Sequence, residues 1–133
     1  MILKVQPDKQ KAKALRLMAE TTLKRVRETD IEKYSSNVLT DYYTIIRDLM
    51  EALTCVEGTK IKGEGSHVKI IDYVCEKHFF DESIRQFLQE LRDYRNRTYY
   101  EGFMIKYSYM KTNQRKIESI IKKLKERLDG VLE

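Results

Sequence analysis

The sequence predicts an all-α protein: a single domain built as an up-and-down bundle of four long helices plus a shorter helix. Three observations support this. The 133 residues include one proline and five glycines, so residues that punctuate turns are scarce. Apolar residues recur at steps of three and four over long stretches, which is the period of an amphipathic helix. A chain this short has room for one hydrophobic core, so residues 1–133 are expected to form one domain.

The first half of the chain contains two predicted long helices. Residues 1–6 are expected to be extended, and Pro7 suits the first position of a helix, so the first helix is placed at 8–28. Residues 37–57 carry the widest apolar stripe of the chain, which predicts the central core helix. Gly58 is expected to end that helix, because glycine adopts the left-handed backbone of a helix C-terminus.

The second half contains the shorter helix and two further long ones. Residues 59–66 include two glycines and are predicted to form a loop. Ser66 is the expected N-cap of the shorter helix. Asp81 is the expected N-cap of a long helix, which Gly102 ends. The last helix is predicted over 104–128, and with 37–57 it should be one of the two longest.

The net charge of +5 is concentrated in the C-terminal part of the chain. Residues 92–127 hold 11 lysines and arginines against 4 acidic residues. A basic stretch of this kind permits contact with nucleic acid or with an anionic surface. The alternative is that it is the solvated face of ordinary helices.

The remaining composition argues for a plain cytoplasmic protein. Cys55 and Cys75 fall inside predicted helices without a CxxC motif, so we expect reduced, buried thiols. No stretch has the apolar length of a signal peptide or a membrane span, so no membrane contact is expected. His67 and His78 are too far apart to predict a metal site, which leaves capping or surface roles. Phosphate-loop and hydrolase motifs are absent, so no cofactor or metal is predicted.

The segment LRDYRNRTYYEGF, residues 91–103, holds the candidate functional residues. On a helix, Arg92, Arg95 and Tyr99 share one face, and Arg97 points roughly opposite to Arg95. Guanidinium groups fork phosphate oxygens and stack on flat rings, so this face suits a phosphate with its base or sugar. The alternative is that the arginines pair with neighbouring carboxylates while the tyrosines pack against the core.

With its helices placed, the chain resembles the HEPN superfamily of small prokaryotic helical bundles over roughly residues 36–107. The resemblance rests on NVLTDYYTIIRDLMEALTCVEG, then a glycine-containing loop, GSHVKIIDYV and LRDYRNRTYYEG. Many members carry Arg-Asn followed after a few residues by His, a pair that implies metal-independent RNA cleavage at a dimer interface. Arg95 and Asn96 match the Arg-Asn, but Tyr100 stands where the histidine is expected.

The resemblance implies a site and partners, and the tyrosine changes what the site does. A phenol with a pKa near 10 is a weak base at pH 7, whereas imidazole titrates near 6.5, so binding is favoured over turnover. Members often pair with a minimal nucleotidyltransferase as toxin and antitoxin, and some are modified on a tyrosine whose equivalent here is Gly102. The implied catalytic set is Arg95, Asn96 and Tyr100; the implied RNA- or nucleotide-binding set is Arg92, Arg95, Asn96, Arg97 and Tyr99.

Three functions follow as hypotheses. The first is a homodimeric HEPN-like protein that binds RNA or nucleotide through a degenerate ribonuclease-type site and the basic last helix, with an active metal-independent endoribonuclease as its stronger form. The second is a ligand-free module that docks on a nucleotidyltransferase or another protein. The third is a sensor of small nucleotides.

Overall fold

The computed structural model describes all residues from Met1 to Glu133. The elements in chain order are β1 (Ile2–Lys4), α1 (Lys9–Arg27), α2 (Ser35–Val56), β2 (Thr59–Ile61), α3 (Ser66–Lys77), α4 (Glu82–Glu101) and α5 (Tyr107–Leu132). The prediction of an all-α protein is confirmed, because the only sheet has two strands of three residues each. The two longest helices, α2 with 22 residues and α5 with 26, lie where they were predicted.

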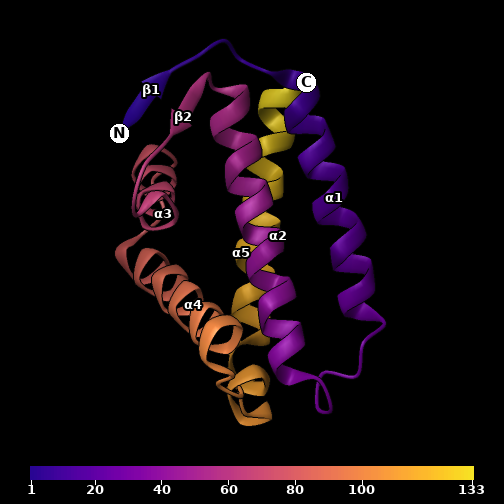
Figure 1. Ribbon diagram of the computed structural model, residues 1–133. Helices are drawn as coiled ribbons and strands as arrows, with labels where there is room; N and C mark the ends of the chain where they lie inside the picture. Colours follow the sequence, from indigo (N-terminus) through magenta and orange to yellow (C-terminus); the bar gives the residue numbers. More distant parts are fainter.

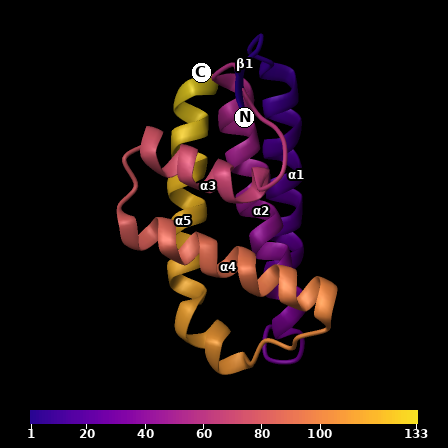
Figure 2. The same cartoon turned by 60° about the vertical axis from the view of Figure 1, so that its left-hand side comes forward.

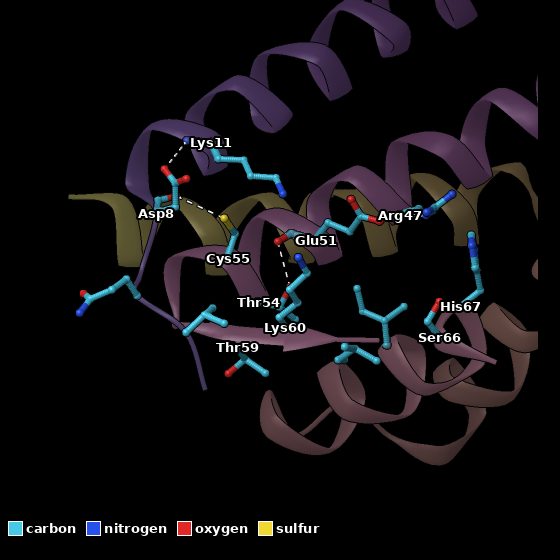
Figure 3. A pocket seen from close by; sticks show the side chains of 14 residues that line it. Asp8, Lys11, Arg47, Glu51, Thr54, Cys55, Thr59, Lys60, Ser66 and His67 are labelled. Atoms are coloured by element: carbon cyan, nitrogen blue, oxygen red, sulfur yellow. Dashed lines mark hydrogen bonds and ion pairs between the residues drawn. The ribbon is translucent and has the colours of Figure 1, made fainter. Parts of the chain in front are cut away.

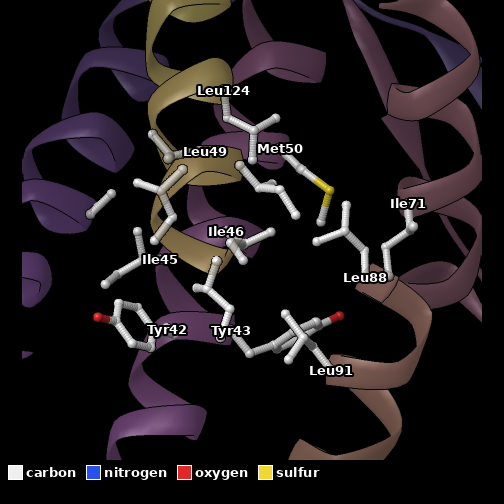
Figure 4. Packing of buried hydrophobic residues seen from close by; sticks show 14 of the residues in the cluster. Tyr42, Tyr43, Ile45, Ile46, Leu49, Met50, Ile71, Leu88, Leu91 and Leu124 are labelled. Atoms are coloured by element: carbon white, nitrogen blue, oxygen red, sulfur yellow. The ribbon is translucent and has the colours of Figure 1, made fainter. Parts of the chain in front are cut away.

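α2 is the centre of the core because it is buried on most of its surface. It lies between α1 and α5 and also contacts α3 and α4 (Figure 1). Figure 4 shows Ile46 and Leu49 of α2 among side chains of other helices, including Leu124 of α5 and Leu88 of α4. The buried apolar residues form one cluster. Burial of one such side chain stabilises the fold by about 1.5–3 kcal/mol, so the wide stripe of α2 decides which helix is central.

The helices form two groups that differ in direction. α1, α2 and α5 run side by side, whereas α3 and α4 form an arm that crosses them obliquely (Figures 1 and 2). The four predicted long helices and the shorter helix are present. Because α3 and α4 cross the others, the single up-and-down bundle is not confirmed. The reason is that the inward face of α4 packs on α2, with α3 beside it, instead of running alongside α5.

A small antiparallel sheet ties the N-terminus to the segment after α2. β1 pairs with β2 so that Ile2 lies opposite Ile61 and Lys4 opposite Thr59. The sequence predicted a loop over 59–66 and no strand, and three residues are too few to show the alternation that identifies one. The pairing brings the extended N-terminal segment across the end of α2.

Three predicted helix ends are confirmed by their backbone geometry. Gly58 follows α2 with φ 74°, and Gly102 caps α4 with φ 68°, both in the left-handed region that favours glycine. The Asp81 carboxylate accepts a hydrogen bond from the Ile84 backbone N–H at 3.0 Å, which caps the start of α4.

Other predicted helix starts are wrong by a few residues. α2 begins at Ser35, two residues early, and the residue before α3 is Gly65, so Ser66 is its first helical residue and not its cap. α5 begins at Tyr107 and not at 104. The buried hydroxyl of Ser36 accepts a hydrogen bond from the Ile105 backbone N–H at 2.8 Å, which holds the linker before α5 in a non-helical path.

The cysteines are unbridged, as predicted, but only one of them belongs to the core. Cys75 is buried, whereas Cys55 is half-buried and its Sγ donates a hydrogen bond to the Asp8 carbonyl at 3.4 Å. No helix combines the length and the apolar character that a membrane crossing requires.

Candidate nucleic-acid interface

The predicted site lies on the C-terminal half of α4. Phe87, Leu88 and Leu91 are buried against the core and fix the rotation of this helix. The same rotation leaves the residues one turn further on at the rim, where Arg92 and Arg95 are half-buried. Their polar heads therefore reach solvent while their aliphatic stems lie along the protein, as long basic side chains commonly do.

Three of the predicted residues form a connected group. The Arg95 guanidinium donates a hydrogen bond to Oδ1 of Asn96 at 3.2 Å and lies 4.7 Å from the centre of the Tyr99 ring. Arg92 donates from Nε to Oε1 of Gln89 at 3.0 Å. A guanidinium over a ring can still use its other N–H groups to bind a phosphate, so the group combines a phosphate-binding cation with an exposed aromatic surface.

Arg97 does not join this group. Its guanidinium lies 4.1 Å from the centre of the Phe103 ring and 5.9 Å from the centre of the Tyr94 ring. This position is on the opposite side of α4 from Arg95. The opposed directions of Arg95 and Arg97 follow the sequence prediction. As a result, the predicted binding set is divided between two faces of the helix, and Arg97 belongs to the junction with α5.

Tyr100 is placed at the exposed end of α4. Its side chain is 73% exposed, and its ring meets the Tyr99 ring edge-on with 5.2 Å between the centres. The Tyr100 hydroxyl makes no hydrogen bond, and the cation nearest in sequence, Arg97, lies against other rings. The Tyr100 hydroxyl therefore faces solvent without a partner that would orient it.

The arginines of this segment are not paired with carboxylates. None of Arg92, Arg95 and Arg97 lies within 4.0 Å of an Asp or Glu oxygen, whereas six other arginines and lysines on the surface make such pairs. Glu90, one expected partner, instead accepts a hydrogen bond from the Tyr109 hydroxyl at 2.5 Å. The alternative of a neutralised helix face is therefore wrong for these three residues.

The structure adds a third guanidinium and an imidazole that sequence reasoning missed. The charges of Arg47 in α2 and of Arg92 and Arg95 in α4 all act on His67 in α3. The same three charges act on the hydroxyl of Tyr43, which is buried and has no hydrogen-bond partner. Positive groups from two helices therefore set the electrostatic environment of one histidine and one buried phenol.

The electrostatics of this group favour a neutral imidazole. The pKa of His67 is lowered, mainly by burial and then by the charges of Arg47 and Arg95, with Glu51 acting in the opposite direction. Burial likewise raises the pKa of Tyr43, and the arginines offset part of that rise. At pH 7 the site therefore presents fixed cations beside a neutral ring that can accept a proton.

His67 is half-buried at the surface, in line with the sequence prediction of a cap or surface residue, but the sequence did not predict its electrostatic environment. The signal that could have found it is Arg47, a cation in the middle of the most apolar helix of the chain. The apolar periodicity of α2 does not show which neighbouring helix Arg47 faces. No group of three or more His, Cys, Asp or Glu side chains is arranged to hold a metal ion.

The basic last helix contributes less to this site than its sequence suggests. Lys116 lies over the Phe87 ring at 4.2 Å, and Lys125 pairs with Glu20 of α1 at 2.8 Å. Other basic residues of α5, such as Lys111 and Lys122, are exposed without an ion pair. α5 thus adds a diffuse positive field instead of a directed contact.

Comparison of the chain with protein-family models, with curated proteins and with solved structures finds no match.

Proposed function

We propose that this protein binds RNA or nucleotide phosphates through Arg92, Arg95 and Asn96, with Tyr99 as a stacking surface. The observation that carries the proposal is that Arg92 and Arg95 of α4 have no carboxylate within 4.0 Å and that the Arg95 guanidinium lies over the Tyr99 ring. Arg47 of α2 acts on the same histidine and phenol as these arginines, but it is paired with Glu51 at 3.1 Å. Like charges held together without counter-ions favour an anionic ligand, and phosphate fits guanidinium in shape and hydrogen bonding.

We further propose that the protein is HEPN-like, with a degenerate ribonuclease-type site. The resemblance assigns Tyr100 to the place of a catalytic histidine, and the exposed, unbonded phenol gives the reacting hydroxyl no useful base. Binding through Arg95 and Asn96 does not need that base. We therefore expect a protein that binds RNA or nucleotide but does not cleave RNA.

An active metal-independent endoribonuclease is the second candidate, and His67 is the observation that favours it. A neutral imidazole beside Arg47 and Arg95 is the type of group that removes a proton from a ribose 2′-hydroxyl while cations stabilise the charged phosphate. In this form of the proposal Tyr100 has no chemical role.

We propose a homodimer as the working assembly, with a minimal nucleotidyltransferase as a partner. The exposed apolar groups at the end of α4 support an interface there: Tyr99 is 68% exposed, and Met104 in the following linker is 73% exposed. A rival interface is the outer face of α1, where Leu17 and Met18 are exposed, and it would suit a ligand-free interaction module. Light scattering at tens of micromolar should give a dimer mass, and a strict monomer would contradict this part.

The binding proposal is tested by fluorescence anisotropy with a labelled single-stranded RNA at low salt. Arg95→Ala should weaken binding about tenfold or more, because a charge-assisted contact contributes about 1.5–3 kcal/mol. The matched control is Arg25→Ala on α1, which removes an exposed arginine whose surface pair with Asp41 contributes little. Equal effects of the two substitutions, or no RNA binding by the native chain, would favour the interaction module.

The two forms of the proposal are separated by RNA cleavage in the presence of a chelator. A degenerate site predicts negligible cleavage by the native chain and measurable cleavage by Tyr100→His, which supplies a base of suitable pKa. An active enzyme predicts native cleavage that survives Tyr100→Phe and is lost in His67→Gln. Native cleavage lost in Tyr100→Phe but kept in His67→Gln would refute both assignments of the base.

A further inference from the structure

A polar pocket separate from the α4 surface opens between the N-terminal segment, α2, β2 and the start of α3 (Figure 3). Its volume of about 370 Å³ lies within the range of sites that hold small molecules. The pocket exists only because β1 pairs with β2 and because the Val5 N–H donates to the Gly58 carbonyl at 2.8 Å. These bonds fix the N-terminal segment as one wall.

The charges that line this pocket leave it positive. The two carboxylates are engaged: Asp8 accepts the Lys11 backbone N–H at 3.0 Å, and Glu51 pairs with Arg47 at 3.1 Å. The ammonium groups of Lys11 and Lys60 have no carboxylate within 4.0 Å, and Figure 3 shows both side chains extending toward Glu51. Three cations against two carboxylates leave the lining with a net positive charge, which favours an anionic ligand.

The lining of the pocket combines hydrogen-bond donors with apolar side chains. At one end, Arg47 and His67 lie together in Figure 3, next to the Ser66 hydroxyl, which makes no hydrogen bond within the protein. Val5 and Ile61 also line the pocket and offer apolar surface. A ligand with a phosphate and a flat ring matches this mixed lining, because phosphate needs donors and a ring needs apolar contact.

We propose that this pocket binds a nucleoside monophosphate, with the phosphate held by Arg47, Lys11 and Lys60. The base lies against the apolar side chains of the lining. Binding here is a function distinct from RNA binding on α4, although Arg47 and His67 border both surfaces. The Ser66 hydroxyl and the neutral His67 imidazole are available as hydrogen-bond donors to the ligand.

The half-buried thiol of Cys55 makes this proposal testable on the native chain, because it lines the pocket. Burial raises the pKa of Cys55, so alkylation with iodoacetamide is run at alkaline pH, where the thiolate forms. Cys75 is buried outside the pocket, and burial raises its pKa to about 11, so it serves as the slow internal reference. Mass spectrometry of the digested protein assigns the alkylated residue.

The expected result is that AMP, GMP, CMP or UMP slows alkylation of Cys55 and leaves Cys75 unchanged. Half-protection should occur below about 1 mM, and adenosine, which lacks the phosphate, should protect at least about tenfold less well. Potassium chloride at matched ionic strength should give no protection. Equal protection by adenosine, protection by salt alone, or none at about 10 mM nucleotide would overturn the proposal.

Variants separate this pocket from the RNA surface. Lys11→Ala with Lys60→Ala removes two exposed side chains, and it should raise the half-protecting concentration about tenfold or more while leaving RNA affinity unchanged. Lys62→Ala with Lys69→Ala, also exposed but outside the pocket, should do neither. Equilibrium dialysis with radiolabelled AMP gives the same answer without the thiol. If AMP does not bind in the dialysis experiment while RNA still binds, the proposal for this pocket is refuted and the proposal for the α4 surface stands.

Discussion

Asp48 of α2 provides a quantitative test of how burial sets charge energies in this fold. Its carboxylate is half-buried, makes no hydrogen bond and has no cation within 4.0 Å. Burial, helped by the negative charge of Glu51, raises the pKa of Asp48 to about 6, and the neighbouring Arg47 only partly opposes the rise. The charged form is therefore strained in the folded protein, and Asp48→Asn should remove that strain.

The sign and size of the effect follow from proton linkage. With an ordinary value of 3.8 and a folded value of about 6, the folded chain binds the Asp48 proton more tightly than the unfolded chain in that window. The free energy of unfolding therefore falls as pH rises from about 4 to 6 and then levels off. A difference of about 2 pH units corresponds to about 3 kcal/mol, and partial exposure reduces this to about 1–2 kcal/mol.

The assay is urea unfolding of the native chain and of Asp48→Asn at pH values from 4 to 8. The variant should be more stable by about 1–2 kcal/mol at pH 7 and equal to the native chain near pH 4, so that the difference between the curves isolates this residue. Asp41→Asn is the control on the same helix, because Asp41 is paired with Arg25 at 2.8 Å and should show no gain at pH 7. A constant difference between the native chain and Asp48→Asn at all pH values would refute the reasoning.

Two further predictions concern the free energy of unfolding. Gly58→Ala should lower the free energy of unfolding more than Gly65→Ala: both glycines have φ near 73°, but a Cβ at Gly58 would lie 2.8 Å from the Val5 carbonyl oxygen and one at Gly65 meets nothing within 4 Å. Gly65→Ala should cost only the left-handed backbone, about 1–2 kcal/mol, so equal losses in thermal unfolding would contradict the clash. Tyr42→Phe should cost about 1 kcal/mol, because the buried hydroxyl loses its bond to Glu118 at 2.7 Å; an unchanged midpoint in urea would contradict this.

Local chemistry explains why much of the fold was predictable. The all-α class and the central place of 37–57 follow from apolar periodicity. This periodicity shows which face of a helix is buried but not which element it packs against. Gly58, Asp81 and Gly102 were placed correctly because a cap is decided by the residue and its immediate neighbours. The expectation that Arg95 and Arg97 point apart rests equally on helix geometry alone.

Long-range contacts explain the predictions that went wrong. Met18 lies at an apolar position of the helical period in α1 but is 58% exposed, because periodicity does not show how wide a face the neighbouring helix covers. β1 and β2 are too short to be recognised singly, and each forms only because the other is brought beside it. The oblique path of α4 likewise depends on the shape of the surface offered by α2 and α3.

The sequence by itself determined the helices, most of their caps and the basic, tyrosine-rich face of α4. Only the tertiary structure decided that Arg47, His67 and Arg95, which come from three different helices, share one electrostatic environment, and that the N-terminal segment closes a pocket beside them. The physical reason is the range over which the interactions act along the chain. Hydrogen bonds and side-chain spacing act over one or two helical turns, whereas the charges of a site meet through packing that no local pattern encodes.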